Sequence, residues 1–289
     1  MTKRKQSKPR VAAASKRGAD GRVHLALQRD PSGQPYLSLR APVFDAAWQN
    51  EIATGAANTV LGILGEKPSL AGAVELGRRV MAATSRLAEG LLARAEAGSV
   101  ACAAGCDHCC HQAVGVTPPE AFAIVDHLKR SLSAFALESF AARIAERVER
   151  THGLTADQRF SPDLPCPFLA SGQCTIYEVR PLVCRGMNSL DAGECEQRLR
   201  DPEARARFVA EGRGGHTYLE PVRAAQAVSA GLQLGVSEVY ALDMRPLELT
   251  AALHVLLGSA VDGSASAWLR GGQPLEAAVH SSAGVEAPR

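Results

Sequence analysis

Residues 102–110 read C-A-A-G-C-D-H-C-C and place four thiols within nine residues. Four further cysteines follow between residues 166 and 195, whereas the 101 residues before Cys102 and the 94 residues after Cys195 contain none. Buried structural cysteines usually scatter through a core as small hydrophobic side chains. Such crowding therefore indicates soft ligands that converge on a soft metal ion.

The expected location of the protein favours metal binding over disulfide bonds. No apolar run approaches the roughly 20 residues of a membrane-spanning helix, and V-A-A-A at residues 11–14 is too short for the apolar part of a secretory signal. We therefore expect a cytoplasmic protein without membrane contact, in which thiols are kept reduced. Clustered cysteines then more often bind metal or carry out redox chemistry. Free structural thiols and a redox dithiol remain the alternatives.

Several kinds of metal centre suit this set of ligands. One block of four thiols would hold one tetrahedral Zn²⁺, and eight thiols near His108 and His111 could hold a second ion or an iron–sulfur cluster. Thiolates around a divalent ion leave net negative charge, so Arg180 and Arg185 are the expected counterions. The choice between zinc and iron stays open, because both favour thiolate ligands.

The composition is that of an ordinary folded protein with a basic N-terminus. Hydrophobic residues make up 46% of the 289 residues and aromatic residues only 4%, so we expect a core of Ala, Leu and Val. Residues 1–17 carry seven Lys or Arg and no acid, which leaves 25 basic against 30 acidic side chains in the rest. We interpret residues 1–20 as a solvated, disordered tail; a contact with nucleic acid is disfavoured because no aromatic residue is interleaved to stack a base.

The N-terminal half predicts one hairpin followed by helices. Alternating apolar residues around a D-P-S-G turn predict a hairpin over residues 22–40. Three- and four-residue apolar steps predict helices over 44–63 and 73–97. Thr117-Pro118-Pro119-Glu120 is typical of a helix start with a capping box. A further helix carries Leu137, Phe140, Ile144 and Val148 on its apolar face, and the polar residues 151–165 predict a loop.

The second cysteine block differs from these helices. The Ser171-Gly172 turn predicts a small hairpin with a cysteine at each end. Further helices are expected over 199–210, 219–234 and 246–258, and Trp268 and Leu275 would anchor a last short helix. The predicted fold class is mainly α, a helical scaffold with a small irregular cysteine-rich metal-binding region and a minor N-terminal β-hairpin. The expected domain divisions are 1–20 (tail), 21–98 (hairpin and helices), 99–200 (cysteine-cluster domain) and 201–289 (C-terminal helices).

The spaced motifs resemble a known family. C-A-A-G-C-D-H-C-C, C-P-F-L and G-Q-C-T-I-Y-E-V-R-P-L-V-C-R occur in the same order in the YkgJ-type cysteine-cluster family, described as chelating zinc or iron. The resemblance covers residues 100–200, and three residues separate the first two cysteines here instead of two. It implies a first ligand group of Cys102, Cys106, Cys109 and Cys110 and a second of Cys166, Cys174 and Cys184, with Cys195 as an addition.

Two classes of function follow. The first is a metal-binding protein in which zinc or iron is structural, stored, sensed or delivered. The sequence does not predict a protein partner for it. The second is an iron–sulfur enzyme or, by resemblance to a related branch, a protein lysine N-methylase that would need a methyl donor. The sequence holds no glycine fingerprint after a predicted strand, and the Gly-rich residues 211–216 favour a plain loop over a phosphate-binding loop. No catalytic residue is predicted.

Overall fold

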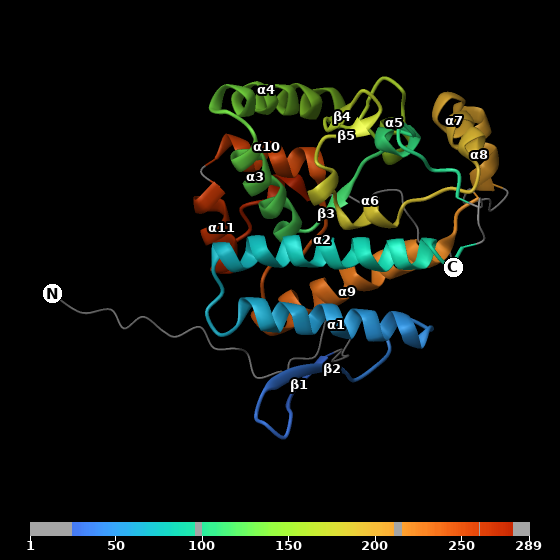
Figure 1. Ribbon diagram of the computed structural model, residues 1–289. Helices are drawn as coiled ribbons and strands as arrows, with labels where there is room; N and C mark the ends of the chain where they lie inside the picture. Colours follow the sequence, from blue (N-terminus) through green and yellow to red (C-terminus); the bar gives the residue numbers. More distant parts are fainter. Residues whose placement is uncertain (1–24, 96–99, 211–215, 260, 280–289) are drawn as a thin grey trace.

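The computed structural model describes residues 25–95, 100–210, 216–259 and 261–279 (Figure 1). The predicted basic tail lies outside these ranges, as do residues 211–215 of the Gly-rich stretch. The described chain is mainly α-helical, and its strands form only small two-stranded antiparallel sheets. The predicted fold class is therefore confirmed. None of the helices in the described ranges combines the length and apolar character needed to cross a bilayer.

Three long helices form the scaffold: α1 (Ala47–Leu64), α2 (Leu70–Leu92) and α9 (Leu219–Tyr240). They lie side by side in Figure 1, with α1 and α9 in the most extensive contact. Gly231 of α9 is pressed against the α1 backbone, since a Cβ there would lie 2.0 Å from the carbonyl oxygen of Ala53. Small residues at this crossing allow two backbones to approach more closely than larger side chains permit.

A second group of helices packs above α2: α3 (Pro118–Ser131), α4 (Ala134–Thr151), α10 (Leu249–Gly258) and α11 (Val261–Leu269). Helix α3 is the most buried, since each residue from 121 to 125 is fully inaccessible. The ring of Phe122 meets the edge of Trp268 at a centroid distance of 5.5 Å. The indole Nε1 of Trp268 donates to the carbonyl of Asp243, so the buried ring has a partner for its polar atom.

The predicted capping box opens α3 and also connects it to the cysteine region. Glu120 Oε2 accepts hydrogen bonds from the backbone N–H and the hydroxyl of Thr117 at 2.9 and 2.7 Å. Its second oxygen, Oε1, accepts from the backbone N–H of Leu182 at 2.8 Å. One buried carboxylate therefore fixes the start of α3 and the segment that carries Cys184.

The N-terminal hairpin is confirmed over the described residues. Strands β1 (Leu25–Arg29) and β2 (Pro35–Leu39) pair in antiparallel register, with Leu25 opposite Leu39. Leu25 and Leu37 are buried, and Asn58 of α1 bonds both the N–H and the carbonyl of Leu37. The hairpin is thus attached to the outer side of α1 (Figure 1).

Short elements make up most of the cysteine region. Its two predicted features, an irregular first block and a small hairpin in the second, are both present. The elements are η1 (His108–His111), β3 (Gly115–Val116), α5 (Ala156–Arg159), β4 (Leu169–Ala170), β5 (Gln173–Cys174), η2 (Tyr177–Val179), α6 (Leu182–Gly186), α7 (Ala192–Arg200) and α8 (Pro202–Ala210).

Several boundaries differ from prediction. The expected helix over 199–210 is broken at Asp201, whose Oδ1 accepts from the N–H groups of Glu203 and Ala204 and begins α8; the preceding α7 was not predicted. The expected loop over 151–165 contains α5. Pro246 precedes a strand, β6 (Leu247–Glu248), which pairs with β3 before α10 begins. The expected last helix is two elements, α11 and η3 (Glu276–Ala278).

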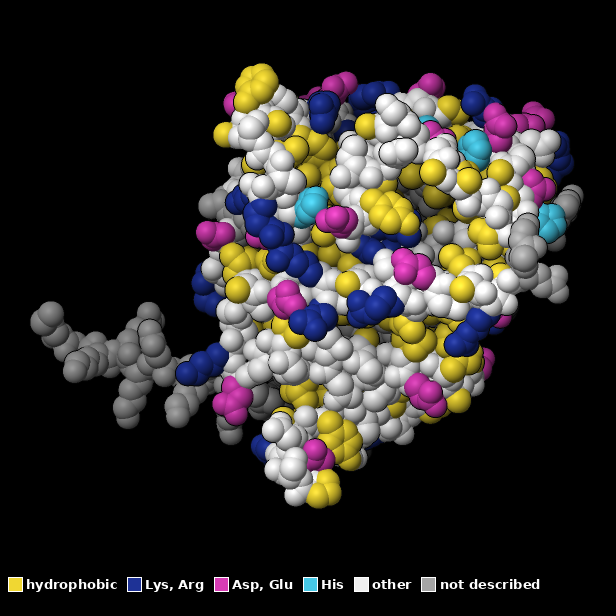
Figure 2. Space-filling view, in the orientation of Figure 1, with side chains coloured by type: hydrophobic (Ala, Val, Ile, Leu, Met, Phe, Trp, Pro, Cys, Tyr) yellow, Lys and Arg dark blue, Asp and Glu magenta, His cyan; other side chains and the backbone are white. Residues whose placement is uncertain are grey.

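The surface carries charges of both signs. Figure 2 shows Lys and Arg side chains across the middle of this face, around α2, with acidic side chains between them. Some of these charges are paired within the scaffold, as in the ion pairs of Arg79 with Glu75 and of Arg78 with Asp126. The scaffold presents this mixed surface beside the cysteine region.

Candidate metal centre

The first cysteine block is a loop that ends in a single 3₁₀ turn, as Gly105 suggested. Gly105 has φ +92°, which a residue with a side chain rarely adopts. The Cys106 N–H donates to Ala103, and the Cys110 N–H donates to Asp107 at 2.7 Å. This turn brings Cys106, Cys109 and Cys110 close together in space.

The second block is joined to the first by main-chain contacts. The Cys166 N–H donates to the carbonyl of Cys110 at 2.6 Å, and the Leu169 N–H then donates back to Cys166. Cys174 lies opposite Leu169 in the β4–β5 hairpin. The hairpin turn touches the first block, since a Cβ at Gly172 would lie 3.3 Å from the Gly105 carbonyl oxygen. The two cysteine blocks, about 60 positions apart in the sequence, are thus adjacent in space.

The last two cysteines, Cys184 and Cys195, lie on helices. Cys184 lies on α6, which packs against α2 and α9. Cys195 lies on α7, which contacts η1. Ser189 connects this part to the first block, because its N–H donates to Cys102 Sγ at 3.2 Å and its side chain acts to lower the pKa of Cys195, which burial raises.

Cys109 is the common neighbour of the group. Its sulfur is close enough to change the pKa values of four other thiols, those of Cys102, Cys174, Cys184 and Cys195. All eight cysteines are free thiols. Within the described ranges no three of the sulfur atoms lie within 4.8 Å of one another, so the thiols gather without forming a closed tetrahedron.

Burial favours the neutral form of the most buried thiols. Burial raises the pKa of Cys166 to about 11 and raises that of Cys184 further. Cys109 is an exposed residue, yet a hydrogen bond with the Cys110 thiol, followed by desolvation of its sulfur, raises its pKa. A thiolate in these places needs positive charge nearby. A divalent cation bound by several thiolates supplies such charge.

Arg180 and Arg185 lie where countercharge was expected. Arg180 lowers the pKa values of Cys109, Cys174 and Cys184. The buried Arg185 donates to the carbonyls of Arg180 and Glu178, each at 2.7 Å, and to the Ser85 hydroxyl of α2. Burial, followed by the charge of Arg180, lowers the pKa of Arg185 to about 10. Arg185 therefore ties η2 and α6 to the scaffold, whereas the Arg180 guanidinium lies over the ring of Tyr177.

The two histidines of the first block have other partners. His111 is buried, and its Nδ1 lies 3.2 Å from the carbonyl oxygen of Ser161. His108 Nδ1 lies 4.0 Å from Asp107 Oδ1. Both rings lie beside the thiols in sequence, and each of these contacts is made through Nδ1.

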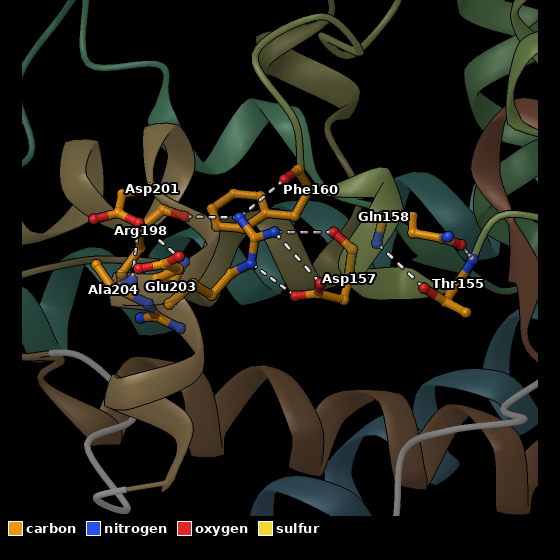
Figure 3. A network of polar contacts seen from close by, with 9 residues as sticks. Thr155, Asp157, Gln158, Phe160, Arg198, Asp201, Glu203 and Ala204 are labelled. Atoms are coloured by element: carbon orange, nitrogen blue, oxygen red, sulfur yellow. Dashed lines mark hydrogen bonds and ion pairs between the residues drawn. The ribbon is translucent and has the colours of Figure 1, made fainter.

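A third arginine holds α7 and α8 to the loop after α4. Arg205 Nε donates to Asp157 Oδ1 at 2.7 Å, and Nη1 donates to the carbonyls of Phe160 and Arg198. Figure 3 shows Asp157 and Phe160 from the α5 segment and Arg198 from α7 converging in this network. Because Arg198 belongs to α7, this network fixes the helix that carries Cys195.

A groove of about 700 Å³ opens onto the centre between α4 and the β4–β5 hairpin. Phe135, Arg143, Arg147 and Cys166 are among its lining residues. Its lining is mixed, since the 79% exposed Phe135 lies in it together with charged side chains such as Arg143 and Glu146. Cys166 is the thiol that this groove reaches from solvent.

One group of candidate ligands was missed by the sequence reasoning. Asp191, Glu194 and His216 each offer a donor atom, and these atoms lie within 4.8 Å of one another. Asp191, the N-cap of α7, precedes Glu194 of that helix by three residues, but His216 follows 22 residues after Glu194. No spacing motif in the sequence connects them, so only the folded chain identifies the group.

The comparisons with known proteins concern the cysteine region. No curated protein and no solved structure matches the chain. Residues 101–202, about a third of the chain, match the family model CxxCxxCC, whose description is "Putative zinc- or iron-chelating domain", and the family likeness expected from the cysteine pattern is thereby confirmed.

Proposed function

We propose that this protein binds zinc or iron in the cytoplasm through its clustered cysteines. The observation that carries the proposal is the convergence of thiols from four separate elements, the η1 loop, β5, α6 and α7, around Cys109. The proposed ligands are Cys102, Cys106, Cys109, Cys110, Cys166, Cys174, Cys184 and Cys195. The match to a zinc- or iron-chelating domain supports the same conclusion.

The donor set fits a soft metal. Thiolates favour zinc and iron–sulfur clusters over hard cations such as Mg²⁺ and Ca²⁺. Arg180 and Arg185 would offset the negative charge of the bound thiolates, and eight sulfurs exceed the four that one tetrahedral ion needs. A bound metal would supply the positive charge that keeps the thiols deprotonated. Two ions or one multi-iron cluster would use the whole set.

The ligand roles can be ranked by position. Cys109 neighbours four other thiols, so Cys109→Ser should reduce bound metal by about half or more. Cys195 lies at the edge, on α7, and Cys195→Ser should have a smaller effect. Thr175→Ser in the β4–β5 hairpin serves as the matched control and should leave the metal content unchanged. Equal metal content in Cys109→Ser and wild type would contradict the assignment.

The test of the function is metal analysis with a visible spectrum on protein purified without oxygen. Iron with sulfide and a broad band near about 400 nm would indicate a thiolate-bound cluster. Colourless protein with stoichiometric zinc would indicate a closed site. Protein without either metal, which also fails to take up Zn²⁺ or Fe²⁺ after reduction, would overturn the proposal.

A further inference from the structure

Asp191, Glu194 and His216 form a group that the cysteine chemistry does not use. Asp191 caps α7, because its Oδ1 accepts from the Glu194 N–H at 3.0 Å. His216 is brought to this end of α7 by its own backbone, whose carbonyl accepts from the Leu190 N–H at 2.5 Å and from the Ser189 hydroxyl. The neighbouring Tyr218 is fixed to Asn188 through two further hydrogen bonds. The three side chains are therefore held together by ordered main chain.

The Glu194 carboxylate is the unusual member. The residue is only 7% exposed, and Oε2 lies 2.5 Å from His216 Nδ1. Oε1 is inaccessible to solvent and has no hydrogen-bond partner. Leaving a buried carboxylate oxygen without a partner is costly, because the desolvation of a charged group is not compensated. A capped helix and one ion pair account for Asp191 and Oε2, but they leave Oε1 unexplained.

We propose that Asp191, Glu194 and His216 form a second metal site, for a divalent ion of the Mn²⁺, Fe²⁺ or Zn²⁺ class. Two carboxylates and one imidazole supply oxygen and nitrogen ligands, which suit these ions and differ from the thiolates of the cysteine centre. The bound ion would give the buried Glu194 carboxylate the partner it lacks. It would also offset the charge of two acidic groups.

The geometry requires a small adjustment on loading. Ligand atoms with bonds of about 2.0–2.1 Å to a tetrahedral ion lie about 3.4 Å apart, so the direct contact between His216 and Glu194 must open by about 1 Å. The His216 side chain is 57% exposed and is free to turn, whereas Glu194 is buried. We therefore expect the ring to move and the carboxylate to stay.

The two sites share one segment but are chemically distinguishable. Glu194 directly precedes Cys195, and Ser189 bonds both Cys102 and the His216 carbonyl. Mn²⁺ favours carboxylate and water ligands, whereas thiolates select zinc, copper(I) and iron–sulfur clusters. Protein given only enough zinc to fill the thiolate centre, which zinc prefers, leaves the second site free, so its titration with Mn²⁺ reports on that site.

The experiment follows free Mn²⁺ by electron paramagnetic resonance as protein is added. Wild type should bind one Mn²⁺ per chain, and His216→Ala and Glu194→Gln should each weaken binding at least about tenfold. Asp191→Asn keeps an N-cap acceptor and removes only the charge; it should weaken binding by less. Glu196→Gln, on the exposed side of the same helix, is the matched control and should bind like wild type.

Two readouts keep this test separate from the cysteine centre. Zinc content and far-ultraviolet circular dichroism should be unchanged in all four variants, which shows that they fold and retain the thiol ligands. Absence of Mn²⁺ binding by wild type, or binding by His216→Ala and Glu194→Gln as tight as wild type, would overturn the second site. Neither result would affect the cysteine proposal, which depends on the zinc or iron content.

Discussion

The helical scaffold and the cysteine region are stabilised by different kinds of interaction. In the scaffold, α1, α2 and α9 bury small and aliphatic residues along their lengths, and Ala53, Ala57 and Val60 of α1 are fully inaccessible. In the cysteine region, meaning the cysteine-bearing segments 101–116 and 152–202, the strands are two residues long and each helix has nine residues or fewer. Apolar burial stabilises the first, whereas the second combines a few buried apolar side chains, such as Phe168 and Leu182, with single polar contacts.

This difference shows where a metal would matter. Structural metal sites contribute binding free energy directly to folding, because the site does not exist in the unfolded chain. The cysteine region has few other sources of such energy, and the scaffold has many. The two meet at Glu120 and Arg185, which bond both to long helices and to the segments that carry the cysteines.

Removal of the metal should give the largest effect, confined to one region. A strong chelator under reducing conditions should raise amide exchange by about 100-fold or more in the cysteine-bearing segments 101–116 and 152–202, because their thiols then make no metal bonds. Helices α1, α2 and α9 should keep their protection. Hydrogen exchange with mass spectrometry measures both. Unchanged protection and unchanged protease resistance in the cysteine region would show that the metal is not structural.

Gly231→Ala should destabilise the whole protein by about 3 kcal/mol, since the new Cβ would clash with the Ala53 carbonyl and force α1 and α9 apart. Denaturant unfolding followed by circular dichroism measures the loss. Gly55→Ala in α1 faces open space and is the matched control; it should be neutral or stabilise by up to about 1 kcal/mol. Similar results for both variants would contradict a tight helix crossing.

Glu120→Gln should cost about 1–3 kcal/mol near neutral pH, because the amide cannot accept from three donors as the carboxylate does. Unlike Gly231→Ala, it should also loosen the segment around Leu182. Denaturant unfolding gives the cost, and hydrogen exchange locates the loosening. Glu138→Gln on the exposed face of α4 should change stability by less than about 0.5 kcal/mol.

The same carboxylate predicts a pH dependence. Burial raises the pKa of Glu120 above its ordinary value of 4.5, so the folded state holds the proton more tightly than the unfolded chain. This contribution to stability is complete below pH 4.5 and is lost as the pH rises through the folded pKa. The stability of wild type minus that of Glu120→Gln should therefore fall as the pH rises through this window. A difference that increases over the same window would contradict the raised pKa.

Ser69→Ala should give the smallest effect, about 1 kcal/mol, because it removes one N-cap acceptor from α2. The loss should appear as a lower midpoint of global unfolding, with no selective loosening of the cysteine region. Ser69→Asp retains an acceptor and should be close to wild type. A local response in residues 101–202 would show that the two regions are less independent than their packing suggests.

The sequence predicted the elements whose signals are local. The capping box at Thr117 and Glu120, the turn at Ser171 and Gly172, and the apolar faces of α1 and α4 depend on residues a few positions apart. The helix break at Asp201 also had a local signal in Pro202, but the high charge of the segment suggested one continuous helix. The paired strands β3 and β6 are too short to produce a periodic pattern and depend on contacts between distant segments.

The sequence predicts which thiols are candidate ligands but not how they are arranged in space. Clustered cysteines identify a soft-metal chemistry from sequence alone. The central position of Cys109 depends on how α6, α7 and the hairpin pack, and the same is true of the contact between His216 and Glu194. The position of Cys109 and the contact between His216 and Glu194 depend on residues far apart in the sequence. The spacing of the residues therefore does not predict them.

The hydrogen bond between Cys166 and Cys110 has a consequence for the entropy of chelation. These residues lie 56 positions apart, and closing a flexible loop of that length costs about 3.6 kcal/mol, from (3/2)RT ln n. Here the intervening chain is not flexible, because it consists largely of α3 and α4, which are packed on the scaffold. The helices have already closed the loop before any ligand binds. An isolated peptide carrying only residues 102–110 would lack this preorganisation, so the intact fold should bind the same ion more tightly than its richest fragment.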